Sequence, residues 1–258
     1  MALPGPPPKV FDRDLIARHL RRRPANRDDF VMRMVLADLD ERLGTVTRSF
    51  EQALLLSPDA AALPKAGRSA NGPFSFARAA TVLAGDGVPL VDPEGLDLPS
   101  RDYDLIVSLF DLDVVDDVPG FLARVRAHLR GDGLFLAAAI GGDSLTELRE
   151  AFLAADLEIS GGAYLRVAPF IPLADAAGLL QRAGFALPVS DIETHIVRYS
   201  SPLGLMQELK ALGAMLSGGA STLEGRAATI FEEKLAQLRG AVPAETPDEP
   251  EMPMGGLG

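Results

Sequence analysis

The chain contains no cysteine and no tryptophan, and only three of its 258 residues are histidine. The absence of cysteine excludes disulfides, thiolate catalysis and zinc or iron–sulfur sites with cysteine ligands. His19, His128 and His195 form no pair at a spacing typical of metal ligands, such as i and i+4. We therefore expect no metal site.

Long hydrophobic runs are also lacking. No apolar run reaches the roughly 18 to 20 residues needed to cross a bilayer, and the start, MALPGPPPKVFDRD, lacks the apolar centre of a secretion signal. A net charge of −11 and a pI of about 4.8 disfavour binding to nucleic acid, which relies on clustered Lys and Arg. We expect a protein of the bacterial cytoplasm, or of the equivalent mitochondrial matrix, that neither binds nucleic acid nor inserts into membranes.

What the sequence does contain is an alternation of short apolar runs with helical patterns. Because continuous apolar runs are typical of strands covered on both faces, the pattern predicts an α/β core with a parallel sheet. In this sheet 53–56, 103–109 and 133–140 should be adjacent parallel strands. The runs predicted as strands are 53–56, 80–84, 88–91, 103–109, 133–140 and 185–197.

Several helices are predicted around these strands. Asp12 is expected to cap a helix over 13–23, and an amphipathic helix follows over about 27–43. The helix between the fourth and fifth runs should stop at Gly131 and Gly133. Later helices are predicted over 173–183, ending at Gly184, and over 203–216 and 222–239.

The helix after the fifth run has its own start signal, because Ser144 and Glu147 have the spacing of a capping box. The chain then divides into four expected parts: a leader with helices (1–44), the α/β core (45–200), C-terminal helices (201–240) and a proline-rich tail predicted to be disordered (241–258).

Residues 91–152 carry a resemblance to a known family. The string VDPEGLDLPSRDYDLIVSLFDLDVVDDVPGFLARVRAHLRGDGLFLAAAIGGDSLTELREAF resembles the central part of class I S-adenosylmethionine-dependent methyltransferases. Together with VFDRDLIARHLRRR and LLQRAGFALPVSDIETHIVRY, it is similar to the mitochondrial complex I assembly-factor branch, whose members are arginine hydroxylases, and to the malonyl-carrier methyltransferase of biotin synthesis. The resemblance spans about residues 10–216. It implies a doubly wound, mostly parallel sheet that binds its cofactor across the carboxyl ends of the strands.

The resemblance also implies which residues would line the site. Asp92 and Glu94 match the adenine side of the cofactor, Ser108 is expected nearby, and Asp86 is a candidate for the ribose hydroxyls or an ordinary turn residue. On the substrate side the match falls on three residues, which a tight exit into a helix explains equally well. These are Gly141, Gly142 and Asp143. No catalytic residue is assigned.

The loop after the first expected strand departs from the family. Where the family has Gly-x-Gly-x-Gly, this chain has Pro58, Asp59, Ala60, Ala61 and Ala62. Glycine is needed there because a Cβ would fill the space of the ligand and because some positions require a positive φ. Proline also stiffens the backbone. We therefore expect binding of S-adenosylmethionine to be lost or nearly lost.

Four carboxylates follow the run 103–109, where the family has a histidine and a tryptophan. Asp111, Asp113, Asp116 and Asp117 suggest a divalent-cation site. We favour a solvated acidic loop in which Asp116 or Asp117 caps the helix at Pro119.

The family's last strand, which inserts between the fifth and sixth strands, has no counterpart in ETPDEPEMPMGGLG, because proline is excluded from a central strand. An exposed sheet edge recruits partners. We therefore favour a pseudoenzyme that acts as a scaffold or regulatory partner, as a homodimer or beside a related active subunit. Two alternatives stay open: a working S-adenosylmethionine-dependent methyltransferase or arginine hydroxylase, and a module that binds another small molecule in the same cleft.

Overall fold

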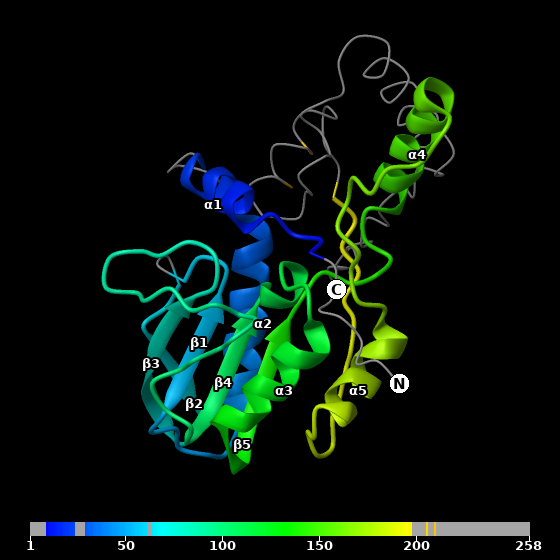
Figure 1. Ribbon diagram of the computed structural model, residues 1–258. Coiled ribbons are helices and arrows are strands. Elements are labelled where there is room, and N and C mark those ends of the chain that lie inside the picture. The colour runs from blue at the N-terminus through cyan, green and yellow to red at the C-terminus, as the bar shows by residue number, and fades with distance from the viewer. Residues whose placement is uncertain (1–8, 24–28, 61–62, 198–204, 206–208, 210–258) are drawn as a thin grey trace, which may run out of the picture.

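The structure is a computed structural model that describes residues 9–23, 29–60, 63–197, 205 and 209 (Figure 1). Within this part the strands are β1 (Ala53–Ser57), β2 (Ala66–Ser69), β3 (Gly72–Ala80), β4 (Tyr103–Leu109) and β5 (Leu129–Ala138). The helices are α1 (Arg13–Arg21), α2 (Phe30–Thr45), α3 (Val118–His128), α4 (Thr146–Ser160) and α5 (Leu173–Arg182), and a 3-10 turn, η1 (Asp111–Asp113), follows β4.

The strands form one sheet in the order β2-β3-β1-β4-β5. Strands β3, β1, β4 and β5 run parallel, and β2 pairs antiparallel with β3. After β1 the chain moves to β3 on one side and then returns to β4 on the other, so the switch point lies between β1 and β4. The doubly wound, mostly parallel sheet is thereby confirmed, and so is the adjacency of the runs 53–56, 103–109 and 133–140.

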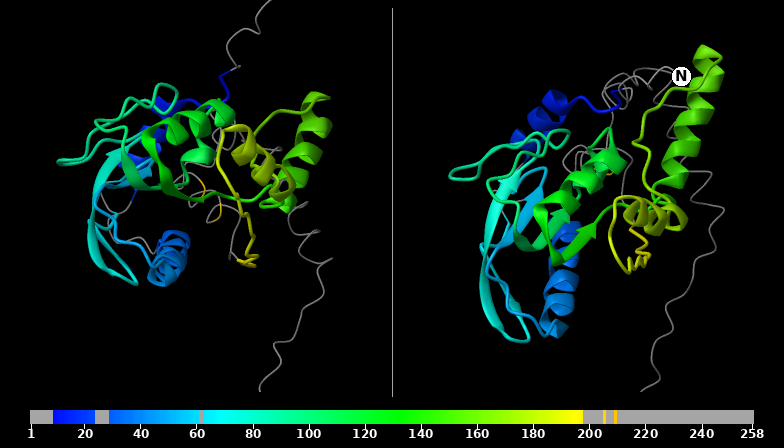
Figure 2. Two further views of the ribbon diagram at one scale, coloured as in Figure 1. Left: turned by 90° about the horizontal axis from the view of Figure 1, so that it is seen from below. Right: turned by 60° about the horizontal axis from the view of Figure 1, so that its bottom comes forward.

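Two apolar clusters cover the faces of the sheet. Helix α2 packs on one face, around Leu43 and Leu55. Helices α3 and α5 pack on the other, around Ile106 and Phe121. Figure 2 shows α2 and α3 on opposite sides of the strands. Every residue of β1 and β4 is buried, as expected for strands whose side chains are covered on both faces.

A third cluster joins α1 to α4. It combines Ile16 and Leu20 of α1 with Phe152 of α4, and it includes Val82 and Val114 from the loops that follow β3 and β4. Helix α1 is therefore packed over the carboxyl ends of these strands, where the cofactor of a doubly wound fold would lie.

The prediction of a strand over 80–84 was wrong, because β3 ends at Ala80 and begins at Gly72. Strands β2 and β3 form a hairpin with Ala70 and Asn71 as its turn, and Gly72, the first residue of β3, has a φ of 128°. Asn-Gly is a strong hairpin signal that the sequence analysis missed. The predicted strand 88–91 is reduced to isolated bridges, one of them between Ala80 and Leu90.

The prediction of a strand over 185–197 was also wrong, because this segment forms no ladder with any described strand. Leu187 adopts a left-handed conformation with a φ of 52°. A strand needs a neighbour to satisfy its backbone groups, and among the described residues this segment has none.

The helix starts and stops were predicted in part. Asp12 caps α1 by accepting a hydrogen bond from Leu15 N at 2.9 Å, and α5 ends just before Gly184, whose φ is 89°. These predictions are confirmed. The helices over 203–216 and 222–239 lie, except for Leu205 and Leu209, outside the described residues, as does the tail 241–258.

Two helix boundaries were wrong. Helix α3 ends at His128 and β5 begins at Leu129, so Gly131 and Gly133 lie inside the strand. A Cβ on Gly133 would lie 3.0 Å from the carbonyl oxygen of Tyr103, so close strand packing explains that glycine. The capping box of Ser144 with Glu147 does not form, because α4 begins at Thr146 after a left-handed Leu145.

None of the helices in the described part of the chain has the length and hydropathy required to cross a membrane.

Candidate functional site

The candidate site lies where β1 and β4 end, at the switch point of the sheet. Four segments meet there: the loop after β1, the start of the loop after β3, the acidic stretch after β4 and the N-terminal helix α1. In doubly wound folds this is the place where ligands bind.

The loop after β1 is closed by protein groups. Pro58 is buried and Ala60 is fully buried. On one side, the Arg78 guanidinium donates hydrogen bonds to the carbonyl oxygens of Ala60 (3.3 Å) and Leu63 (3.0 Å). On the other side, Arg23 forms an ion pair with Asp59. Side chains and packing therefore hold the backbone that a glycine loop would leave accessible to a ligand.

Backbone hydrogen bonds tie the same loop to the segment after β3. Thr81 N donates to Ser57 O at 3.0 Å, and the amides of Val82 and Leu83 both donate to Pro58 O. The carbonyl oxygens at the end of β1 are thus satisfied within the protein, and the chain crosses over the end of the strand.

Asp92 and Glu94 are brought together by a cation. Arg13 of α1 forms ion pairs with both, at 3.3 Å from Asp92 Oδ1 and closer to Glu94 Oε1. Glu94 also accepts a hydrogen bond from Asp116 N at 2.9 Å and lies 3.5 Å from the Arg124 guanidinium. The two carboxylates expected on the adenine side of a cofactor are therefore already bound by side chains of this chain. We call Arg13, Asp92 and Glu94 the arginine clasp.

The next two carboxylates anchor neighbouring backbone. Asp116 accepts hydrogen bonds from the amides of Val10 (2.7 Å) and Phe11 (3.0 Å), which fixes the chain before α1. Asp117 caps α3 by accepting from Gly120 N at 2.9 Å. The prediction that Asp116 or Asp117 caps this helix is confirmed for Asp117.

Asp111 lies deeper and is fully buried. It accepts hydrogen bonds from the hydroxyls of Thr81 (2.6 Å) and Ser108 (2.7 Å). Burial raises the pKa of Asp111 to about 7, and the two hydroxyl donors lower it only in part. Ser108, expected near the cofactor, is therefore fully buried and bonded to this carboxyl group.

Asp113 is buried as well, and its carboxylate accepts from Ile140 N. Burial raises the pKa of Asp113 well above its usual value. The expectation of a solvated acidic loop was wrong for Asp111 and Asp113, because Phe110 turns the chain inward with a φ of 66°. Among the residues that the structure describes, no group of side chains is arranged to hold a metal ion.

The remaining predicted residues lie apart from the arginine clasp. Asp86 is exposed in a turn closed by the hydrogen bond from Val88 N to Gly85 O. Gly142 donates to Ile171 O at 3.0 Å, and a Cβ on it would lie 2.9 Å from Pro172 Cα, so packing explains this glycine. Gly141 contacts Ile192, and Asp143 is exposed.

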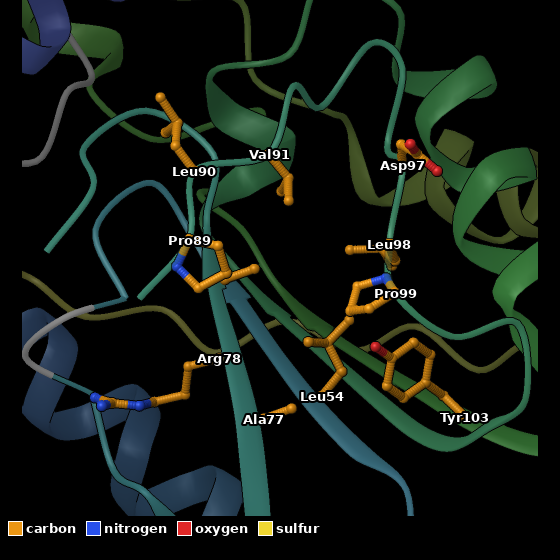
Figure 3. A pocket seen from close by; sticks show the side chains of 11 residues that line it. Leu54, Ala77, Arg78, Pro89, Leu90, Val91, Asp97, Leu98, Pro99 and Tyr103 are labelled. Atoms are coloured by element: carbon orange, nitrogen blue, oxygen red, sulfur yellow. The ribbon is translucent and has the colours of Figure 1, made fainter. Parts of the chain in front are cut away.

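A hollow of about 550 Å³ lies on the face of β3, beneath the segment 89–99 (Figure 3). Ala77 and Ala79 leave this space open because their side chains are small. The Tyr103 hydroxyl and the Asp97 carboxylate are the polar groups on one side of it, and Arg78 turns away from them. The hollow lies beside the sheet, and none of the three residues of the arginine clasp lines it.

Three arginines that contact the site were not predicted from the sequence. They are Arg13, Arg23 and Arg78. Arg13 is separated from Asp92 by 79 positions, and no local pattern links them. Arg78 alternates with apolar residues along β3, and this pattern indicates a strand. It does not predict which group the guanidinium contacts.

S-adenosylmethionine does not fit the residues present. The carboxylates for its adenine side are bound to Arg13, the alanine that replaces a loop glycine is fully buried, and Ser108 is bonded to Asp111.

Comparisons with known proteins point to one superfamily. The chain is 35% identical over 161 residues to "Arginine-hydroxylase NDUFAF5, mitochondrial" of Rattus norvegicus, a match that covers 60% of this chain and 47% of the relative. It is 37% identical over 139 residues to "Malonyl-[acyl-carrier protein] O-methyltransferase" of Laribacter hongkongensis, covering 54% of this chain and 43% of the relative. The chain thus spans about half the length of the curated relatives it matches.

Two further comparisons, one with a solved structure and one with a family model, give weaker matches. The solved structure of the YcgJ protein from Bacillus subtilis is 12% identical, covers 60% of this chain and 69% of its own, and has a TM-score of 0.39, from which no conclusion follows. A family model described as the thymidylate synthase ThyX C-terminal domain matches residues 206–241, far less than half of the chain. The relatives confirm the relationship to the class I methyltransferase superfamily.

Proposed function

We propose that this chain is a methyltransferase-fold protein whose cofactor site is closed by its own side chains, and that it acts as a non-catalytic scaffold or regulatory partner of another protein. The observation that carries this proposal is the closed loop after β1, in which Ala60 is fully buried and its carbonyl oxygen is bonded to Arg78. The arginine clasp adds to it, because Arg13 binds both Asp92 and Glu94, the pair that the resemblance assigns to the adenine side.

The clasp alone does not account for the closure. Arg13 and Glu94 are both partly exposed and the Asp92 side chain is 66% exposed, and such ion pairs contribute only about 0.2–1 kcal/mol each. The loop after β1 contributes more, because Ala60 is fully buried and its carbonyl oxygen is bonded to Arg78. Opening this loop would expose packed residues and leave backbone groups without partners.

The resemblance to the complex I assembly-factor branch suggests the setting. A chain that keeps this fold but closes its cofactor site would serve the assembly of a respiratory complex through protein contacts, in the bacterial cytoplasm or the mitochondrial matrix. Its partner would be a second copy of the chain or a related active subunit.

A second function is favoured by a specific observation. Asp92 and Glu94 are both present and lie together at the expected place, and a relative at 35% identity is named an arginine hydroxylase. In this alternative α1 swings away, Arg13 releases the carboxylates, and the chain works as an S-adenosylmethionine-dependent enzyme.

Calorimetric titration separates the two functions. We expect no saturable binding of S-adenosylmethionine or S-adenosylhomocysteine up to about 1 mM, a limit of roughly −4 kcal/mol. Arg13→Ala frees the two carboxylates but leaves the loop after β1 closed, so this variant should also fail to bind.

Two results would favour the enzyme instead. One is a micromolar dissociation constant for the unmodified chain that Asp92→Ala abolishes. The other is binding of S-adenosylmethionine by the Arg13→Ala variant, which would show that the arginine clasp blocks a site that can otherwise bind the cofactor.

A further inference from the structure

Strand β5 has an exposed outer side. It pairs with β4 along one edge, and no described residue forms a ladder with the other. Of its ten residues only Leu129 is buried, and Leu134, Phe135 and Leu136 are half-buried. This edge therefore offers backbone donors and acceptors beside partly exposed apolar side chains, the combination to which another strand adds.

A second unpaired element is the segment Asp191-Ile192-Glu193-Thr194-His195-Ile196-Val197, which we call the 191–197 segment. Its β-branched side chains at 192, 194 and 196 alternate with polar ones at 191, 193 and 195. Alternation of this kind, which here extends over 191–196, is typical of a strand with one covered face. Yet Ile196 is 76% exposed, and the segment forms no ladder within the described residues.

The two elements are neighbours in the molecule. The ring of Phe185 stacks on that of Phe135 in β5, with centroids 5.1 Å apart. Asp191 forms an ion pair of 2.9 Å with Arg42 of α2. In Figure 1 the yellow chain that follows α5 runs upward between α3 and α5 and on toward α4. Phe185, six positions before the 191–197 segment, thus contacts β5, and Asp191 at its start contacts α2, while the backbone of the segment pairs with no strand in the described part of the chain.

We propose that a second copy of this chain covers the surface, with the 191–197 segment of each copy adding as a strand to β5 of the other. The proposal rests on the proposed function in one respect, namely that the chain works through protein contacts. Strand addition would satisfy the backbone groups of both elements and cover Ile192 and Ile196.

Self-complementarity favours a second copy over an unrelated strand. Each chain carries both an open edge and an unpaired strand-like segment, so one two-fold contact uses each of them twice. Charge agrees with this choice. The polar side of the segment carries Asp191, which pairs with Arg42, and Glu193, which lies 3.3 Å from His195, so the segment presents two carboxylates. Arg126 presents a cation at the amino end of β5, where it donates to the carbonyl oxygens of Leu129 and Gly184.

Sedimentation of the full chain over a range of concentrations gives the first test. We expect a dimer that Ile196→Lys weakens by about tenfold or more, because a charge at a covered position of an added strand opposes pairing. Leu90→Lys is the matched control, since Leu90 is also an exposed apolar residue, at 56%, but lies far from β5. It should leave the dimer unchanged, and circular dichroism should show both variants folded.

Cross-linking gives the second test, because the chain has no cysteine of its own. Chains carrying Leu134→Cys and chains carrying Thr194→Cys, with tags of different size, are mixed and oxidised. The mixture should form the mixed disulfide faster than either chain forms its own.

A chain that stays monomeric up to about 100 µM overturns the proposal, as does a dimer unaffected by Ile196→Lys or one that forms no mixed disulfide. Repeating the sedimentation with S-adenosylmethionine distinguishes failure of the dimer interface from failure of the closed-site function. If the cofactor binds while the dimer persists, the closed-site function fails and the interface stands.

Discussion

Strands β4 and β5 are hydrogen-bonded neighbours in one parallel sheet, yet their surroundings differ sharply. All seven residues of β4 are buried, whereas one of the ten in β5 is. Strand β4 has strands on both edges and helices on both faces. Strand β5 is paired along one edge, and its outer edge pairs with no described strand. Parallel sheets are normally covered on both faces and paired inside. The difference marks β5 as the incomplete side of the sheet.

The same contrast separates the carboxyl ends of β1 and β4, where a cofactor is expected, from the outer edge of β5, where a protein partner is expected. At the carboxyl ends of β1 and β4, carboxylates, carbonyl oxygens and hydroxyls have partners within the chain. Beside β5, apolar side chains such as Val189 and Ile196 are more than three-quarters exposed. We propose that the first region is a closed cofactor site and that the second is where a strand of another copy adds.

The largest expected effect is at the centre of the sheet. Leu105→Ala in β4 removes a fully buried side chain and should lower the free energy of unfolding by about 2–5 kcal/mol. Val189→Ala, at an 87% exposed position, should change it by less than about 0.5 kcal/mol. Urea denaturation of the two variants measures the difference. Equal losses would contradict the division into a packed centre and an open side.

The second prediction concerns pH. Because the folded-state pKa of Asp111 is raised to about 7 from an ordinary 3.8, the folded protein keeps a proton there that the unfolded chain has lost. The stability of the native protein should therefore fall as the pH rises from 5 to 7. Relative to Asp111→Asn, which cannot ionise, the loss should reach about 1.4 kcal/mol per pH unit.

Denaturant unfolding of both proteins at several pH values tests this. A constant difference in stability between them would mean that Asp111 is already ionised in the folded state. Asp113 is also buried, but it is present in both proteins, so its own titration largely cancels from the comparison.

The third prediction compares a capped helix with an uncapped one. Asp117→Ala removes the hydrogen bond to Gly120 N at the start of α3 and should cost about 1 kcal/mol. Ser144→Ala, before α4, should cost much less, because the side chain of Ser144 does not cap that helix. Thermal unfolding of the two variants gives the ranking, and a larger loss for Ser144→Ala would show that α4 has been assigned the wrong start.

The smallest expected effect is beside β5. Leu187 is 93% exposed and has a left-handed φ of 52°, a conformation that asparagine adopts more easily than leucine. Leu187→Asn should therefore raise the free energy of unfolding by about 0.5 kcal/mol. A loss of stability in the same denaturation experiment would indicate that the Leu187 side chain has a packing role.

The centre of the fold could be predicted because its signals are local and strong. The runs 53–56 and 103–109 are continuously apolar, and burial on both faces follows directly from that. Asp12 precedes its helix at the position where a side-chain oxygen meets a free backbone amide. The strand over 185–197 failed for the opposite reason. Its alternation describes a suitable strand, but pairing depends on a neighbour that no pattern within the segment supplies.

The candidate site was located in part. Asp92 and Glu94 lie on one loop and both pair with Arg13, and their role on the adenine side of a cofactor stays a prediction. The partner Arg13 could not be predicted, because tertiary packing alone brings α1 over the sheet. The burial of Asp111 and Asp113 could not be predicted either, because an aspartate in an acidic loop is normally exposed, and the inward turn at Phe110 decides its place.

We propose that the chain's own side chains close the cofactor site, and a crystal structure grown with excess S-adenosylhomocysteine tests this most directly. We expect no density for that molecule at the ends of β1 and β4, with Arg13 still bound to Asp92 and Glu94 and Arg78 still bonded to the Ala60 carbonyl oxygen. Density for S-adenosylhomocysteine between Ser57 and Asp92, with α1 displaced and Arg13 released, would contradict it.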